Sequence, residues 1–113
     1  MTLNDYLAQI KANTPVSFAE SIAVISENYV YQSTAFQNGS VENAAGQNEG
    51  SCKIFAFGKL NNLTEQQTLS IFGDYYRIEV LQNPDATDHQ NIRQFMQHGW
   101  TGIVFENEAL KIA

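Results

Sequence analysis

The sequence is poor in the residues that build disulfides and membrane spans. Cys52 is the only cysteine among 113 residues, so an intramolecular disulfide is impossible and the fold does not depend on an oxidising compartment. No apolar run approaches the ~18–20 residues that a bilayer-spanning helix needs. The first residues, MTLNDYLAQIKANTP, lack the basic segment followed by an apolar segment that marks a secretory signal. We therefore expect a cytoplasmic protein.

Basic residues are scarce as well. Six lysines and arginines stand against twelve acidic residues, which gives a formal net charge of −6. Non-specific binding to nucleic acids draws most of its affinity from Lys and Arg side chains that displace counterions from phosphates, and anionic membranes attract the same side chains. The charge balance argues against nucleic acids and membranes as partners, and leaves an unknown protein or small molecule.

What the sequence does contain is enough apolar material for one core. Hydrophobic residues make up 43% of the chain and include seven Phe, five Tyr and one Trp. A chain of this length buries roughly 65% of its unfolded surface, which suffices for a core without disulfides or structural metals. We predict a single domain over residues 1–113.

Capping boxes and helical spacing locate the helices. Ser17 and Glu20 form one capping box, and Thr64 and Gln67 form a second. In this motif each side chain accepts a hydrogen bond from a free N–H group of the first turn. Helices are expected over the segments 3–13, 18–28, 52–61, 64–72, 74–81 and 88–97.

The segment 52–61 is apolar on all sides and would be central. A buried strand is the rival interpretation, since periodicity does not separate the two in a short apolar run. We favour a helix, capped by Ser51. Gly58 would then mark the close approach of a neighbouring element, because glycine in a helix costs about 1 kcal/mol relative to alanine.

Two segments have the composition of strands. Residues 29–36 and 100–105 are rich in β-branched and aromatic side chains. Between the first strand and residue 50 the chain is polar, with a turn at Asn38-Gly39, and we predict a long loop over 37–50. The fold class that follows is α+β: a mainly helical single domain with a small antiparallel sheet of two or three strands.

The first candidate site is the polar junction before the central helix. It contains Asn48, Glu49, Ser51, Cys52 and Lys53. A helix N-terminus has free N–H groups that favour an anion and lower the pKa of a cysteine. The alternative is that Cys52 simply packs in the core, as free cysteines usually do.

The second candidate site is the start of the last predicted helix, which holds Asp88, His89, Asn91 and Arg93. His89 and Arg93 are one helical turn apart, whereas His98 lies on the opposite side of the same helix. The two histidines therefore cannot converge on one metal ion, and we predict neither a metal site nor a cofactor. The plainer interpretation makes Asp88 the N-cap and the other residues an ion-paired edge.

Two further groupings have a chemical and a structural interpretation. Cys52, His89 and Asp88 have the residue types of a nucleophile, a base and an orienting acid, but adjacent residues point about 100° apart on a helix, so Asp88 is poorly placed to orient His89. The run Asp74–Arg77 has the composition of an interface anchor, although tyrosine and arginine serve equally well at the edge of a core.

Three long strings resemble one known family. They are NEGSCKIFAFGKL at Asn48–Leu60, FGDYYR at Phe72–Arg77 and DHQNIRQFMQHGWTGIVF at Asp88–Phe105. Through these strings the chain resembles the HopJ type III effector family, from about residue 18 to residue 105. The resemblance implies possible delivery by type III secretion and no assigned catalytic residue or ligand. Such delivery generally uses a flexible, Ser-rich N-terminus, whereas the first residues here predict a helix.

These observations give two functional hypotheses. The first is a non-enzymatic interaction or regulatory domain whose binding surface includes the loop 37–50. The alternative is a small enzyme or ligand-binding protein with a polar cleft formed by Asn48–Lys53 and Asp88–Arg93, which requires the two segments to meet in space. If neither holds, every one of these residues is scaffold, and the mutation of His89 or Arg93 changes stability alone.

Overall fold

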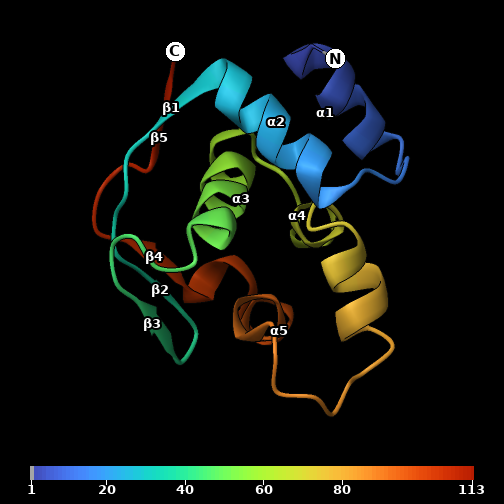
Figure 1. Ribbon diagram of the computed structural model, residues 1–113, viewed down its shortest axis with the longest axis vertical. Helices are drawn as coiled ribbons and strands as arrows, with labels where there is room; N and C mark the ends of the chain where they lie inside the picture. Colours follow the sequence, from blue (N-terminus) through green and yellow to red (C-terminus); the bar gives the residue numbers. More distant parts are fainter. Residues whose placement is uncertain (1) are drawn as a thin grey trace.

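The computed structural model of the protein describes residues 2–113 (Figure 1). Its helices are α1 (Leu3–Lys11), α2 (Phe18–Asn28), α3 (Glu49–Leu60), α4 (Glu65–Ser70), the π-helix η1 (Tyr75–Val80), α5 (Gln90–His98) and the 3₁₀ helix η2 (Gly99–Gly102). Its strands are β1 (Tyr29–Tyr31), β2 (Phe36–Asn38), β3 (Val41–Asn43), β4 (Ile103–Phe105) and β5 (Leu110–Ile112). The predicted α+β class with a small antiparallel sheet is confirmed. Across residues 2–113 no helix is long and apolar enough to cross a membrane.

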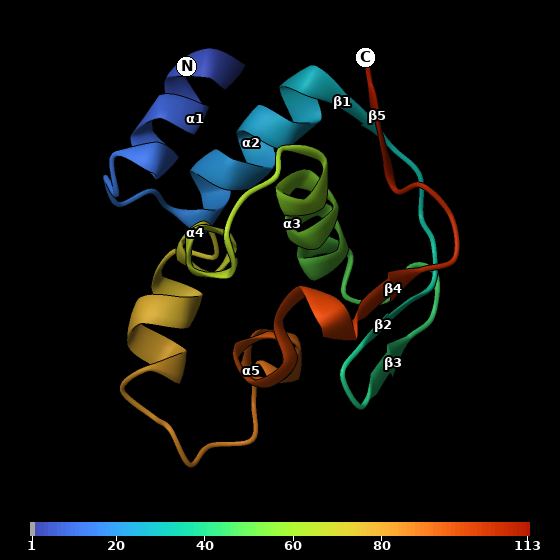
Figure 2. The ribbon, with the colours of Figure 1, turned by 180° about the vertical axis from the view of Figure 1, so that it is seen from behind.

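The central helix is α3. It lies in the middle of the molecule, with α1, α2 and α4 on one side and the strands on the other (Figures 1 and 2). Ile54, Phe55 and Phe57 have no exposed surface, because an apolar face on every side of the helix requires neighbours on every side. The choice of a helix over a buried strand for this segment is thereby confirmed.

Gly58 marks a close approach, as predicted. A Cβ atom at this position would lie 2.7 Å from Thr68 Oγ1 and 3.0 Å from the Trp100 ring. Only glycine leaves the space into which α4 and Trp100 pack against α3.

Both predicted capping boxes are present. Ser17 Oγ accepts from the Glu20 N–H at 3.1 Å, and the Glu20 carboxylate accepts from the Ser17 N–H at 3.1 Å. Thr64 and Gln67 make the same pair of bonds at 3.0 and 2.9 Å. These interactions are local in sequence, which is why the sequence predicts them well.

The predicted strand 29–36 is divided between two sheets. β1 pairs with β5, and β2 pairs with both β3 and β4, all antiparallel. The residues between β1 and β2 continue the pairing irregularly, since the Gln32 N–H donates to the Ala109 carbonyl and the Glu106 N–H donates to that of Ala35. β5 was not expected, and of the predicted strand 100–105 only β4 is extended.

The prediction of a long loop over 37–50 is wrong. The segment contains the end of β2, a tight turn at Gly39–Ser40, β3 and the start of α3. Its polar asparagines misled the prediction, because Asn38 and Asn43 point inward and are buried rather than solvated. A hairpin and a helix start replace the loop on which the first functional hypothesis depended.

Two helices begin at other residues than expected. α3 begins at Glu49 after Asn48, and α5 begins at Gln90 after His89, so neither Ser51 nor Asp88 is an N-cap. Asn48 and His89 both adopt left-handed backbone conformations, with φ of 50° and 51°. The Asp88 carboxylate is engaged by Arg93 at 2.8 Å instead of by the helix. The predicted helix at 74–81 is present, but in the π form.

Candidate functional site: a cavity between the N-termini of α3 and α5

Segments far apart in the sequence meet at one cavity of ≈ 570 Å³. From α3 and the residue before it come Asn48, Gly50 and Ser51. From α5 and the residue before it come His89, Gln90, Asn91 and Ile92. The rest of the lining consists of Val41 and of aromatic residues, Phe18, Phe72 and Tyr75. The two candidate segments of the sequence therefore do lie side by side.

One wall of the cavity is aromatic. The Phe18 ring stacks on the Phe72 ring with a centroid distance of 6.4 Å. It also lies edge-on to the Tyr75 ring, with a centroid distance of 5.2 Å. The Tyr75 ring in turn lies 5.4 Å from the imidazole of His89. The backbone of Gly50 lies directly against the Phe18 ring, so that a Cβ atom at position 50 would be 2.9 Å from Phe18 Cζ. This wall offers flat, apolar surface to a bound molecule.

The other wall is polar and includes the first turns of two helices. The side chains of Asn48 and His89 do not cap the helices that follow them, whereas Thr2, Ser17 and Thr64 each cap theirs. The first N–H groups of a helix have no partner within the helix. The cavity lining includes first-turn residues of both helices, Gly50 and Ser51 of α3 and Gln90 and Asn91 of α5.

A network of asparagines lies behind the polar wall, with Asn38, Asn43 and Asn91 buried and Asn48 exposed. Asn91 Nδ2 donates to Asn43 Oδ1 at 3.0 Å, and Asn43 Nδ2 donates to Asn91 Oδ1 at 3.1 Å. Asn48 Nδ2 donates to Asn43 Oδ1 at 2.7 Å, and Asn38 Nδ2 donates to the Asn91 carbonyl at 2.7 Å. The network ties the start of α3 to the start of α5 through the β2–β3 hairpin, so it fixes the width of the cavity.

Asn38 is the least satisfied member of this network. Its side chain is 0% exposed, and its Oδ1 has no hydrogen-bond partner among residues 2–113. A buried acceptor without a partner costs about 1–3 kcal/mol. The other bonds of the network must offset that cost, which makes the network sensitive to the loss of any one member.

Cys52 is not part of the cavity lining. It is 1% exposed and lies in the hydrophobic core. Burial raises the pKa of the Cys52 thiol above its ordinary value, and the nearby Tyr31 side chain opposes this only in part. Of the two interpretations of Cys52, packing in the core agrees with the structure and a thiolate at a helix N-terminus does not, because Cys52 lies one turn into α3 and inside the core. The neighbouring Lys53 places its ammonium 4.7 Å from the centre of the Tyr31 ring.

His89 has partners that the sequence did not predict. Its Nε2 lies 2.8 Å from Glu79 Oε1 and 3.9 Å from Asp88 Oδ2. Arg93 binds Asp88 through the 2.8 Å ion pair and donates from Nε to the Asp88 carbonyl at 2.6 Å. The hydrogen bond from Arg93 lowers the pKa of the Asp88 carboxyl. The structure thus gathers Glu79, Asp88, His89 and Arg93 in an ion-paired edge, while Cys52 lies elsewhere, so the grouping of nucleophile, base and acid does not form.

The residues of the run Asp74–Arg77 have different roles: some stabilise the fold, and one lines the cavity. Tyr76 is buried, and Arg77 donates to the carbonyls of Val16 at 2.7 Å and Ser70 at 3.0 Å. Tyr75, by contrast, is 42% exposed and faces the cavity. Arg77 therefore serves the fold, and Tyr75 is the residue of this run that a ligand would contact.

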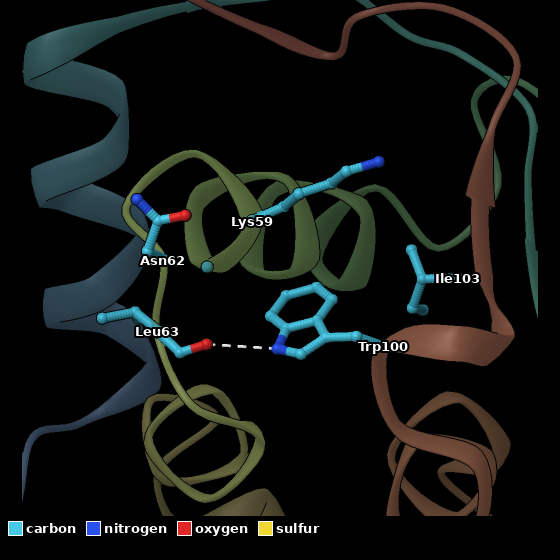
Figure 3. Close-up of a pocket in the computed structure, with 6 residues that line it drawn as sticks. Lys59, Asn62, Leu63, Trp100 and Ile103 are labelled. Carbon is cyan, nitrogen blue, oxygen red and sulfur yellow. Dashed lines mark hydrogen bonds between the residues drawn. The ribbon is translucent and has the colours of Figure 1, made fainter.

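A second hollow lies at the other end of α3 (Figure 3). It has a volume of ≈ 310 Å³ and is bordered by Gly58, Lys59 and Trp100. The Trp100 indole N–H donates to the Leu63 carbonyl at 3.1 Å, and the Lys59 side chain extends away from the ring (Figure 3). Because the Trp100 indole N–H is already bonded to the backbone, this hollow has fewer free hydrogen-bonding groups for a ligand than the cavity at the start of α3.

Fold and cavity together define a small α+β domain with a half-aromatic, half-polar cleft between two helix N-termini. The chain belongs to the family described as HopJ type III effector protein, whose model matches residues 3–110. It is also similar to a solved crystal structure described as that of the unknown-function protein VPA0580. The two share 48% sequence identity with a TM-score of 0.97, and the match covers 100% of this chain and 95% of that one. Among proteins with curated descriptions none matches.

Proposed function

We propose that the protein binds a small molecule in the cavity between α3 and α5. The observation that supports this is the convergence of residues 48–51 and 89–92 on one cavity of ≈ 570 Å³. Ligand sites are typically clefts of about 300–1,000 Å³ in which apolar and aromatic walls are combined with a few polar groups. The proposal is one of binding alone, because Cys52, the candidate nucleophile, is buried outside the cavity.

The lining suggests the chemistry of the ligand. Phe18, Phe72 and Tyr75 suit a flat apolar part, while the side chains of Asn48 and Gln90 offer both donors and acceptors. With a net charge of −6 on the chain, a highly charged anion would be repelled over long range. A small, flat molecule with several hydrogen-bonding groups and little charge fits both walls.

A screen by nuclear magnetic resonance tests this proposal. Titration of ¹⁵N-labelled protein with a library of flat heterocyclic metabolites should shift the amide signals of residues 48–51 and 89–92 together. Ser51→Phe, which places a ring in the cavity, should abolish those shifts. Ser26→Phe on the exposed face of α2 is the matched control and should leave them unchanged. Ligands that shift other residues, or that bind the Ser51→Phe variant equally well, would refute the cavity as the binding site.

The hypothesis of an interaction domain stays a prediction, but the surface that it assigns to the partner is now different. Because residues 37–50 form a hairpin and a helix start, a protein partner would contact the β2–β3 hairpin rather than a flexible loop. We propose a cytoplasmic location, which agrees with a fold that needs no disulfide. Delivery by type III secretion, which the family description suggests, is testable with a reporter fused to the C-terminus.

A further inference from the structure

We propose that Glu79, Asp88 and His89 form a binding site for a divalent transition-metal ion at the rim of the cavity. One oxygen or nitrogen atom from each residue lies within 4.8 Å of the other two. The donors come from η1 and from the segment just before α5, with Glu79 and His89 separated by 10 positions. One imidazole and two carboxylates form a donor set that Zn²⁺ and similar ions accept.

The distances fit a shared ion. With metal–ligand bonds of about 2.1 Å at tetrahedral angles, any two ligand atoms on one Zn²⁺ ion lie roughly 3.4 Å apart. His89 Nε2 is 2.8 Å from Glu79 Oε1 and 3.9 Å from Asp88 Oδ2. Small rotations of two exposed carboxylate side chains would bring all three atoms onto one ion.

Arg93 holds one of the ligands in place. It bonds Asp88 Oδ1, which leaves Oδ2 directed at His89. A second residue that orients a ligating carboxylate is a common feature of metal sites. The Arg93 side chain is itself only 11% exposed, so its position is defined by packing against the protein.

His89 connects the proposed ion to the cavity. Its ring lies against Tyr75 and lines the cavity wall. Three protein ligands leave open coordination positions, as in catalytic zinc sites, and an oxygen or nitrogen of a bound molecule could take one of them. This last link rests on the proposed function, whereas ion binding by the three residues does not.

The experiment uses Zn²⁺ alone, without an organic ligand, so its failure is distinguishable from failure of the proposed function. The chain has two histidines, and their ring signals can be followed separately by nuclear magnetic resonance. Zn²⁺ should shift the His89 ring saturably with one ion per chain. His98 should not respond.

Three variants separate this site from adventitious binding. His89→Asn keeps a residue that tolerates the left-handed backbone at φ of 51°, and Glu79→Gln keeps the side-chain shape. Each should weaken Zn²⁺ binding by more than about tenfold, measured by isothermal titration calorimetry. His98→Asn is the matched control and should bind as the wild type does. Equal affinity of the Glu79→Gln variant and the wild type, or an equal response of the His98 ring, would overturn the proposal.

Discussion

Helix α3 has a glycine near each end, and the two glycines have different surroundings. At its C-terminal end Gly58 allows Thr68 and Trp100 to pack directly on the helix. At its N-terminal end Gly50 faces a cavity, with the Phe18 ring as its near neighbour. At the first end the Trp100 indole N–H is bonded to the Leu63 carbonyl, and at the second the first residues of α3 line a cavity of ≈ 570 Å³. The contrast teaches that α3 is anchored at one end and available for recognition at the other.

Removing the ring that closes the anchored end should have the largest effect. Trp100→Ala takes away the indole that packs on Phe95 at 5.0 Å and bonds the Leu63 carbonyl. Truncation of a buried tryptophan costs about 3–5 kcal/mol, and the partial exposure of Trp100 favours the lower end. Urea unfolding measures this. A loss below about 1 kcal/mol would show that the end is not anchored by Trp100.

Disruption of the asparagine network at the N-terminal end of α3 should lower the free energy of unfolding nearly as much as Trp100→Ala does. Asn91→Ala removes the side-chain bond to Asn38 Nδ2 and both side-chain bonds to Asn43, while Asn38 Nδ2 keeps its bond to the backbone carbonyl of residue 91. We expect a loss of about 2–3 kcal/mol in unfolding free energy, since each of the three lost buried hydrogen bonds contributes about 1 kcal/mol. Asn107→Ala, at an exposed asparagine whose bond to Thr34 comes from the backbone, should cost less than about 0.5 kcal/mol. Similar losses in the two variants would contradict a structural role for the network.

The two glycines give the sharpest test of the comparison. Alanine gains about 1 kcal/mol in helix propensity at either position. At Gly58 the added Cβ meets the fixed Thr68 side chain at 2.7 Å, so we expect a net loss of about 1–2 kcal/mol. At Gly50 the contact is with the far end of the half-exposed Phe18 ring, which can move, so stability should hardly change while the cavity narrows. Thermal unfolding of both variants checks this, and a larger loss at Gly50 would reverse the comparison.

The smallest effect concerns Cys52, which lies between the two ends. Because burial raises its pKa, the native thiol should react with iodoacetamide more than about 100-fold more slowly than the unfolded chain near neutral pH. The preference of the fold for the neutral Cys52 thiol contributes fully to stability below a pH of 9.0, the ordinary pKa of the group. This contribution is lost as the pH rises through the higher pKa of Cys52 in the folded protein. Rapid labelling of the folded protein at pH 7 would show that the helix start is open at Cys52.

The sequence predicted what depends on near neighbours. Both capping boxes, the helical segments and the need for glycine at position 58 follow from short patterns. It did not predict the burial of Asn38 and Asn43, because their partner Asn91 lies far along the chain and polar residues ordinarily indicate a loop.

The candidate site shows the same division. The meeting of the segments Asn48–Lys53 and Asp88–Arg93 was a hypothesis that the cavity lining supports, but Glu79 was missed as the partner of His89. Glu79 and His89 are brought together by a π-helix and by a left-handed residue before α5. Neither feature has a strong local signal in the sequence. The position of Cys52 was misjudged for a smaller reason, because the start of α3 was placed three residues late.

The hairpin turn has a consequence for the chemical lifetime of the protein. An asparagine followed by glycine is prone to deamidation, in which the glycine nitrogen attacks the asparagine side-chain carbonyl. In the fold the Asn38 amide is held by Asn91, and the Gly39 N–H donates to the Gly102 carbonyl at 3.0 Å. Both reacting groups are thereby restrained, and the product would place a carboxylate where no solvent reaches. Folding therefore slows the ageing of this turn, and any ligand or ion that keeps α5 in place would extend the same protection.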